Sequence, residues 1–251
     1  MHAMQILLAS LTRLLGHRGT RRSFAALQEM LDVHGPFEYI LDGANIGFFG
    51  QGRGLKEVKG RDATARCRHG EASGSCDGAV APRASVERRT AVQELFQYEQ
   101  VEGVLRAARV LSARVLLVLH TNHTVGVLPG TRAAELLARW RAGGMLYVTP
   151  KGLNDDIFWL YAAIASPGGY RVVSNDEMRD HHFTLLHERA FLAWKERHLV
   201  RFDFRRPSAI PALSLPRPFT PAVQEDESSG TWHFPSALPA RWLCAWPVVQ
   251  L

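Results

Sequence analysis

The sequence predicts an α/β protein with a parallel central sheet flanked by helices and a small irregular or β lobe at its C-terminal end. Apolar runs of strand character recur along the chain, and segments of helical character separate them. The runs are FEYILD (37–42), VLLVLH (115–120), MLYVTP (145–150), YRVVS (170–174) and LVRFDF (199–204). Strands that alternate with helices of this length are typical of right-handed βαβ units, and therefore of a parallel sheet.

The N-terminal elements follow from local signals. A helix is predicted around residues 22–34, ending at Gly35-Pro36 because proline blocks its continuation. FEYILD then forms a strand that delivers Asp42 at its end and breaks at Gly43. Residues 50–90 are rich in Gly, Ser, Ala and Arg and lack apolar periodicity, so we expect a mobile basic surface insertion.

Helices and strands alternate after the insertion. Helices are predicted near 93–111, over 132–144, from an Asn154 N-cap over 155–165, and from near Glu177 onward. From about Pro207 the chain is proline-rich and then aromatic, without regular period. We therefore divide the chain into an N-terminal extension or remnant of an upstream domain (1–21), a catalytic-type domain (22–206) and the C-terminal lobe (207–251).

Composition bounds the class of protein. The 251 residues suffice for a sizeable core, and 46% hydrophobic residues is typical of a globular chain. Three cysteines do not form a disulfide framework, which favours a reducing compartment. No run approaches about 20 uninterrupted apolar residues, so we expect no membrane span. The net charge of +6 suits a nucleic-acid partner, although its excess lies in residues 1–22 and 53–90.

The N-terminal 24 residues contain arginines and no acid. This pattern is compatible with an organellar transit peptide and equally with an ordinary amphipathic helix at a domain boundary. We expect an intracellular protein, with mitochondrion, plastid and nucleus all left open.

Acidic side chains follow strand-like runs or open a helix. They are Asp42 in YILDGANIG, Asp155 and Asp156 in LNDDIFWLYAA, and Asp176 and Asp180 in VVSNDEMRD. The carboxyl ends of parallel strands form one shared edge, where ligands bind. Carboxylates drawn together there would repel one another unless hard cations lay between them. We therefore predict a nuclease that uses Mg²⁺ or Mn²⁺, with two ions clamping a phosphodiester.

These motifs, with WKERH and WHFP, resemble the metallonuclease domain of protein-only RNase P, in the NYN branch of PIN-like nucleases. The resemblance covers roughly residues 22–250 outside the insertion. It implies an endonuclease that removes the 5′ leader of precursor tRNA and leaves a 5′-phosphate on the tRNA. It also implies that Asp42, Asp155, Asp156 and Asp176 are the catalytic metal-site carboxylates, with Asp180 in support and Asp156 and Asp176 as direct ligands.

The resemblance also implies a structural zinc site, of which this chain shows half. His233 and Cys244 match the C-terminal ligands, but no CxxC precedes Asp42, and Cys67 and Cys76 do not have its spacing. Structural zinc takes four ligands, so the site is incomplete here. Core packing is the alternative role of the pair. The family's tRNA-gripping repeats are also missing, so we expect a truncated form, an isolated domain, or a chain that needs an RNA-binding repeat protein in trans.

Several further residues are candidates for contact with RNA. Basic side chains flank the acidic motifs at Arg179, His181, His182, Lys195 and Arg197. Each is equally explained as a surface residue or a helix end, and Trp159, Tyr161 and Trp194 are interpreted as core. Two other functions stay open, namely a PIN-like RNase with a different RNA substrate and a catalytically silent RNA-binding module.

Overall fold

The computed structural model describes residues 9, 11, 18–51, 95–165, 170–178, 188–204, 210–217, 223–236 and 242–246, with only the backbone at 18–21 and 188–190. Within these ranges the first half of the chain forms α2 (Arg18–His34), β1 (Tyr39–Asp42), α3 (Gly43–Gly47), α6 (Tyr98–Leu111), β2 (Val115–His120), the 3₁₀ turn η1 (Thr121–His123) and α7 (Arg132–Ala142). The second half forms β3 (Leu146–Thr149), α8 (Asp155–Ala165), β4 (Arg171–Val173), α10 (Glu188–His198), β5 (Leu199–Asp203), β6 (Ala212–Ser214), β7 (Gln224–Asp226), β8 (Thr231–Pro235) and β9 (Trp242–Ala245).

The central sheet has six strands in the order β3-β2-β1-β4-β5-β6. Strands β1 to β5 are parallel, and β6 pairs antiparallel with β5. The chain adds β2 and β3 on one side of β1, crosses back through α8, and then adds β4 and β5 on the other side. The gap between the carboxyl ends of β1 and β4 is therefore the switch point where open α/β sheets bind ligands.

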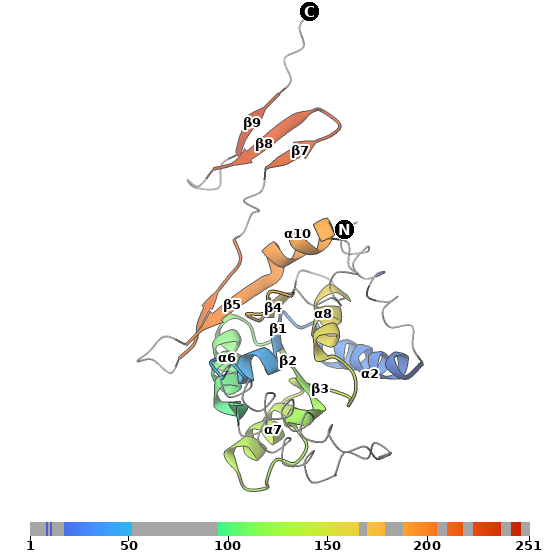
Figure 1. Ribbon diagram of the computed structural model, residues 1–251, viewed down its shortest axis with the longest axis vertical. Helices are drawn as coiled ribbons and strands as arrows, with labels where there is room; N and C mark the ends of the chain where they lie inside the picture. Colours follow the sequence, from blue (N-terminus) through green and yellow to red (C-terminus); the bar gives the residue numbers. More distant parts are fainter. Residues whose placement is uncertain are drawn as a thin grey trace, which may run out of the picture.

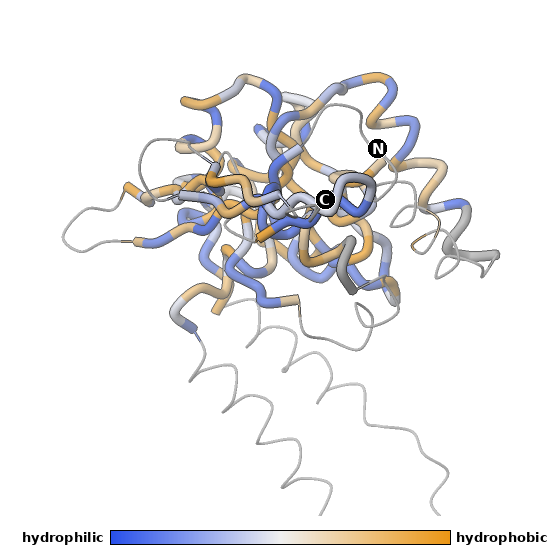
Figure 2. The backbone as a smooth tube through the Cα atoms, turned by 90° about the horizontal axis from the view of Figure 1, so that it is seen from above, coloured by the Kyte–Doolittle hydropathy of each residue, from blue (hydrophilic) through white to orange (hydrophobic). Residues whose placement is uncertain are grey.

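Alternate residues of the strands build two cores, one on each face of the sheet. Ile40 and Val172 face α2, α8 and α10, where Phe158 and Trp159 are fully buried. Leu41 and Val173 face the opposite way, toward α6 and α7. Helices thus cover both sides of the sheet (Figure 1), and hydrophobic and hydrophilic residues alternate along them (Figure 2). This confirms the predicted parallel sheet flanked by helices.

The chain returns close to α3 after residue 51. The Gln97 backbone N–H donates to the Gly47 carbonyl at 2.9 Å, and the Phe96 and Phe48 rings pack edge to face at 5.2 Å. A Cβ on Gly47 would lie 2.2 Å from the Phe96 ring, so glycine is needed for this approach. The ends of the segment 52–94 are therefore held together by backbone and aromatic contacts.

The C-terminal strands form a second, antiparallel sheet in the order β7-β8-β9. In Figure 1 it lies beyond α10, away from the six-stranded sheet. The predicted β lobe is thus present, although Ala212–Ser214 (β6), which we placed within it, pairs with β5 in the main sheet. None of the helices in the described ranges has the length and apolar character needed to cross a membrane.

Some predicted boundaries differ from the structure. Helix α2 begins at Arg18, earlier than predicted, and ends before Gly35-Pro36 as predicted. The helix predicted near 93–111 is interrupted, since Leu95 is helical but Phe96 turns into the core beside Gly47, and α6 begins at Tyr98. The predicted helix from near Glu177 does not include Glu177 or Met178, which are not helical, with a φ of +53° at Met178, and residues 179–187 lie outside the described residues. The insertion 50–90, apart from residues 50 and 51, lies outside the described residues.

His123 gives the fold a pH dependence. Its side chain is 7% exposed and stacks on Phe96 at 4.5 Å, and its Nδ1 has no hydrogen-bond partner. Burial, with a smaller effect of His120, lowers the pKa of His123 to about 4. Between pH 6.5 and 4 the unfolded chain binds a proton that the folded chain rejects, so stability falls as the pH falls.

We expect His123→Phe to remove this acid sensitivity, which amounts to about 3 kcal/mol across the window. Phenylalanine keeps the ring stack and has no titrating group. Urea unfolding of both proteins at pH 7 and pH 4.5 measures the difference. An unchanged drop in stability between the two pH values would show that His123 is not its source.

Candidate active site

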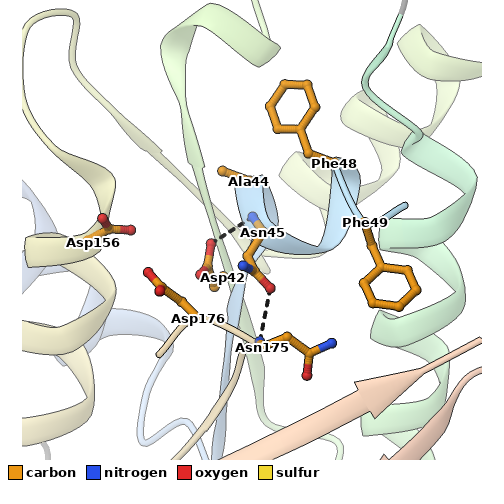
Figure 3. Close-up of a pocket in the computed structure, with 8 residues that line it drawn as sticks. All are labelled: Asp42, Ala44, Asn45, Phe48, Phe49, Asp156, Asn175 and Asp176. Carbon is orange, nitrogen blue, oxygen red and sulfur yellow. Dashed lines mark hydrogen bonds between the residues drawn. The ribbon is translucent and has the colours of Figure 1, made fainter. Parts of the chain in front are cut away.

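A pocket of about 330 Å³ opens at the carboxyl edge of the sheet, at the switch point between β1 and β4. Its polar lining comes from β1 and α3, from α8 and from the residues after β4, with two phenylalanines at one side (Figure 3). The lining residues are Asp42, Ala44, Asn45, Phe48, Phe49, Asp156, Asn175 and Asp176. Three of the predicted carboxylates therefore share one pocket.

Asp42 ends β1 and caps α3. Its Oδ1 accepts from the Asn45 backbone N–H at 3.0 Å, and its Oδ2 accepts from the Ser174 hydroxyl at 2.7 Å. Gly43 allows α3 to start against β2, since a Cβ there would lie 2.7 Å from the Val118 carbonyl oxygen. Burial raises the pKa of Asp42 well above its ordinary value, and the charge of Asp156 raises it further.

Asp156 enters the pocket from the first turn of α8. The Asn154 side chain accepts from the Asp156 backbone N–H at 2.9 Å, as expected of an N-cap. The buried Trp159 indole donates to Asp156 Oδ1 at 3.2 Å, which fixes the carboxylate against the core. Figure 3 shows this carboxylate directed toward Asp176 and Asp42.

Asp155 is not among the residues that line the pocket. Adjacent residues on a helix point about 100° apart, so the two aspartates cannot share one direction. Burial raises the pKa of Asp155, and the nearby His120 acts in the opposite direction. Asp155 therefore contributes charge beside the pocket, close enough to raise the pKa of Asp42 slightly.

Asp176 is placed by the residues that follow β4. The Ser174 hydroxyl oxygen accepts from the Asp176 backbone N–H at 3.0 Å while its proton reaches Asp42. The Asn175 backbone N–H donates to Asn45 Oδ1 at 2.9 Å. The side-chain amide of Asn175 donates to the Phe202 carbonyl and accepts from the Phe202 backbone N–H. One serine and two asparagines thus join β1, β4 and β5 around the pocket.

The donor set fits a hard divalent cation. Carboxylate and amide oxygens are the ligands that Mg²⁺ prefers, and the charges of Asp156 and Asp155 both raise the pKa of Asp42. Within the described ranges, no three acidic, histidine or cysteine side chains lie close enough to enclose an ion by themselves.

The predicted basic residues have different positions. Lys195 is bound to the Glu177 carboxylate at 3.1 Å and is only 20% exposed, while Arg197 is exposed in the last turn of α10. Arg179, Asp180, His181 and His182 lie outside the described residues. Trp159 and Trp194 are buried as predicted, and Tyr161 is partly buried. Sequence reasoning missed Ser174, Asn45 and Asn175, although they stand inside the acidic motifs.

The family model for protein-only RNase P matches residues 76–244, which is most of the chain. The chain belongs to the protein-only RNase P family. It is 34% identical to proteinaceous RNase P 1, chloroplastic/mitochondrial, of Arabidopsis thaliana over 94% of this chain. It is also 34% identical to proteinaceous RNase P 2 of the same plant over 84% of this chain.

Solved structures of this protein-only RNase P family share the fold. The crystal structure of nuclear proteinaceous RNase P 2 from Arabidopsis thaliana superposes with a TM-score of 0.64 and 31% identity over 96% of this chain. The chain spans only about a third of the length of these curated relatives, 35% and 33%, and 43% of that solved chain.

The part of the chain matched by the family model contains the Asp155–Asp156 pair and Asp176, and ends at Cys244. His233 of β8 and Cys244 of β9 are directly opposite each other in the antiparallel sheet. The His233 Nδ1 and the Cys244 Sγ lie 3.1 Å apart. The two residues predicted as half of a zinc site are therefore adjacent, while Cys67 and Cys76 lie outside the described residues.

Proposed function

We propose that this chain is a metal-dependent endoribonuclease that removes the 5′ leader of precursor tRNA. The observation that supports it best is the convergence of Asp42, Asp156 and Asp176 on one pocket at the switch point of the sheet. The curated relatives are named proteinaceous RNase P, which supports the choice of substrate. Water would add to the scissile phosphorus, leaving a 5′-phosphate on the tRNA and a 3′-hydroxyl on the leader.

Asp42, Asp155, Asp156 and Asp176 are the proposed metal-site carboxylates, with Asp156 and Asp176 as direct ligands and Asp180 in support. When bound, Mg²⁺ or Mn²⁺ supplies charge neutralisation at the phosphate and lowers the pKa of water; we propose two such ions. The indole of Trp159 and the hydroxyl of Ser174 hold the carboxylates in place before substrate arrives. Such preorganisation removes the need to reorder the site during the reaction.

Precursor tRNA would contact the basic residues that flank the acidic motifs in the sequence. We propose Arg197, Arg179, His181 and His182 as phosphate contacts, because Lys and Arg that neutralise phosphates release counterions. An RNA-binding repeat protein in trans is a further proposed partner. We also place the protein inside the cell, in mitochondrion, plastid or nucleus, after the names of the relatives.

Single-turnover cleavage of a 5′-extended precursor tRNA tests the function. We expect one cut at the mature 5′ end in Mg²⁺ and none in EDTA. An unstructured RNA of equal length is the matched control. Equal cleavage of both RNAs would identify a PIN-like RNase with a different substrate. Binding without cleavage in Mg²⁺, also after addition of a repeat protein, would identify a silent RNA-binding module.

The C-terminal sheet supports a second metal proposal. His233 and Cys244 would supply two ligands of a structural Zn²⁺, which needs four. The other two ligands would have to come from outside the described residues. Metal analysis of the purified, folded chain decides this, and a zinc content near zero would remove the proposal.

A further inference from the structure

The segment that carries Asp176, residues 174–178, is held on its outer side by two cations. Arg201 of β5 donates from Nη1 to the Asp176 carbonyl oxygen at 3.2 Å and from Nη2 to Glu177 Oε1 at 2.7 Å. Lys195 of α10 donates to the Glu177 carbonyl oxygen at 2.8 Å and to Glu177 Oε2 at 3.1 Å. Two of these four contacts thus reach the backbone of the segment.

The ion pairs alone do not account for this arrangement. The Arg201, Glu177 and Lys195 side chains are 35%, 50% and 20% exposed, and ion pairs at such positions contribute only about 0–1 kcal/mol to stability. The main effect of these contacts is to fix the position of residues 176 and 177. The planar guanidinium of Arg201 donates from two nitrogens to acceptors on two successive residues. A lysine ammonium has one nitrogen and lacks this fixed, forked geometry.

The backbone of this segment is also held in an unusual conformation. Met178 has a φ of +53°, in the left-handed region that non-glycine residues rarely adopt, and its side chain is 4% exposed. Its backbone N–H donates to Asp176 Oδ1 at 2.9 Å, so this conformation helps to orient the carboxylate. A strained backbone persists when surrounding contacts determine it, and Arg201 and Lys195 supply such contacts.

We propose that Arg201 is a positioning residue for Asp176, acting through the Asp176 carbonyl and the Glu177 carboxylate, with Lys195 holding Glu177 from the other side. The inference rests on the proposed function in one respect, which is that Asp176 binds the divalent cation. It gives Lys195 a structural task in place of the RNA contact predicted from sequence. The competing role for Arg201 is direct contact with an RNA phosphate.

The test compares Arg201→Met, Arg201→Lys and the wild-type full chain. Methionine keeps the aliphatic stem but makes neither contact, and lysine keeps the charge without the two-pronged geometry. Arg171→Met is the matched control. Arg171 is the first residue of β4, at the end of the strand away from the pocket, and its Nη1 donates to the Tyr39 hydroxyl at 3.0 Å. Mn²⁺ affinity is measured by electron paramagnetic resonance without RNA, RNA affinity in EDTA, and cleavage under single turnover.

We expect Arg201→Met to weaken Mn²⁺ binding about tenfold and to slow cleavage by a similar factor, as loss of an outer-shell partner does. Affinity for precursor tRNA in EDTA should be unchanged, Arg201→Lys should recover part of the loss, and Arg171→Met should match the wild type. Wild-type Mn²⁺ affinity in Arg201→Met would overturn the inference, and a loss of RNA affinity alone would assign Arg201 to phosphate contact. Should Arg201→Met not fold, Arg201→Lys with wild-type Mn²⁺ affinity overturns it equally.

If the proposed function is wrong, the wild-type chain itself gives a different result from the one expected here. A wild-type chain that binds Mn²⁺ without cleaving precursor tRNA removes the activity, while the affinity of the Arg201 variants still tests positioning. A wild-type chain that binds no Mn²⁺ removes the metal site itself, and the inference with it.

Discussion

Asp156→Asn is expected to abolish Mg²⁺-dependent cleavage while leaving the fold intact. Loss of a metal ligand removes several kcal/mol of stabilisation from the transition state, which corresponds to a rate lower by about a thousandfold or more. Asparagine retains an oxygen that accepts from the Trp159 indole, so the free energy of unfolding should change by no more than about 1 kcal/mol. Single-turnover cleavage and thermal melting by circular dichroism measure the two effects.

Asp156→Ala separates metal binding from packing. It should be as inactive as Asp156→Asn but less stable, because the acceptor facing Trp159 is also removed. Glu135→Gln is the control, since Glu135 forms an exposed ion pair with Arg132 on α7, and it should change neither activity nor stability. Cleavage that persists in Asp156→Asn, or an unfolded spectrum of that variant, would refute the assignment of Asp156 as a ligand.

Asp42→Asn is expected to abolish cleavage and to stabilise the metal-free protein at neutral pH. Burial and the charge of Asp156 raise the pKa of Asp42 in the folded protein. At pH values between the unfolded pKa near 3.8 and this raised pKa, the folded state therefore binds the Asp42 proton more tightly than the unfolded state does. The contribution of Asp42 to stability therefore decreases as the pH rises through this window. Asparagine has no charge to lose, and its amide can donate to the Ser174 oxygen.

Thermal melting across pH 4 to 8 in EDTA, and again in Mg²⁺, measures this effect. In EDTA the melting temperature of the variant should exceed that of the wild type most clearly at the alkaline end. Mg²⁺ should raise the melting temperature of the wild type, because a ligand of the folded state stabilises it, and should affect the variant much less. A variant that melts below the wild type in EDTA at pH 8 would mean that the hydrogen bonds of Asp42 outweigh its buried charge.

The strands and the carboxylates at their ends could be predicted from the sequence because buried strands leave a simple pattern. Strands such as Val115–His120 are continuous apolar runs that must be buried on both faces, and a polar residue at the end of such a run can only lie at the sheet edge. Asp42 and Asp176 follow directly from this rule. The resemblance of the motifs to protein-only RNase P, which the comparisons confirm, rested on the same residues.

Other parts of the site depend on contacts between distant segments, which local patterns do not encode. The local pattern does not tell which of Asp155 and Asp156 enters the pocket, because that depends on how α8 packs through Trp159, and only the resemblance favoured Asp156. Arg201 lies 25 residues from Asp176 in the chain and meets it only because β4 and β5 pair. The left-handed backbone at Met178, where the local sequence favoured the start of a helix, likewise has no local signal.

The contacts between Gly47, Phe96 and Gln97 have a consequence for chain length. They bring residues 47 and 97 together, so the entropy of closing the chain is one free-energy term that depends on the number of residues between them. This term grows only logarithmically, by about 0.6 kcal/mol for each doubling of the loop. Changes in the length of the chain between these contacts therefore carry a small closure cost, although Asp42 of the pocket stands only a few residues before them.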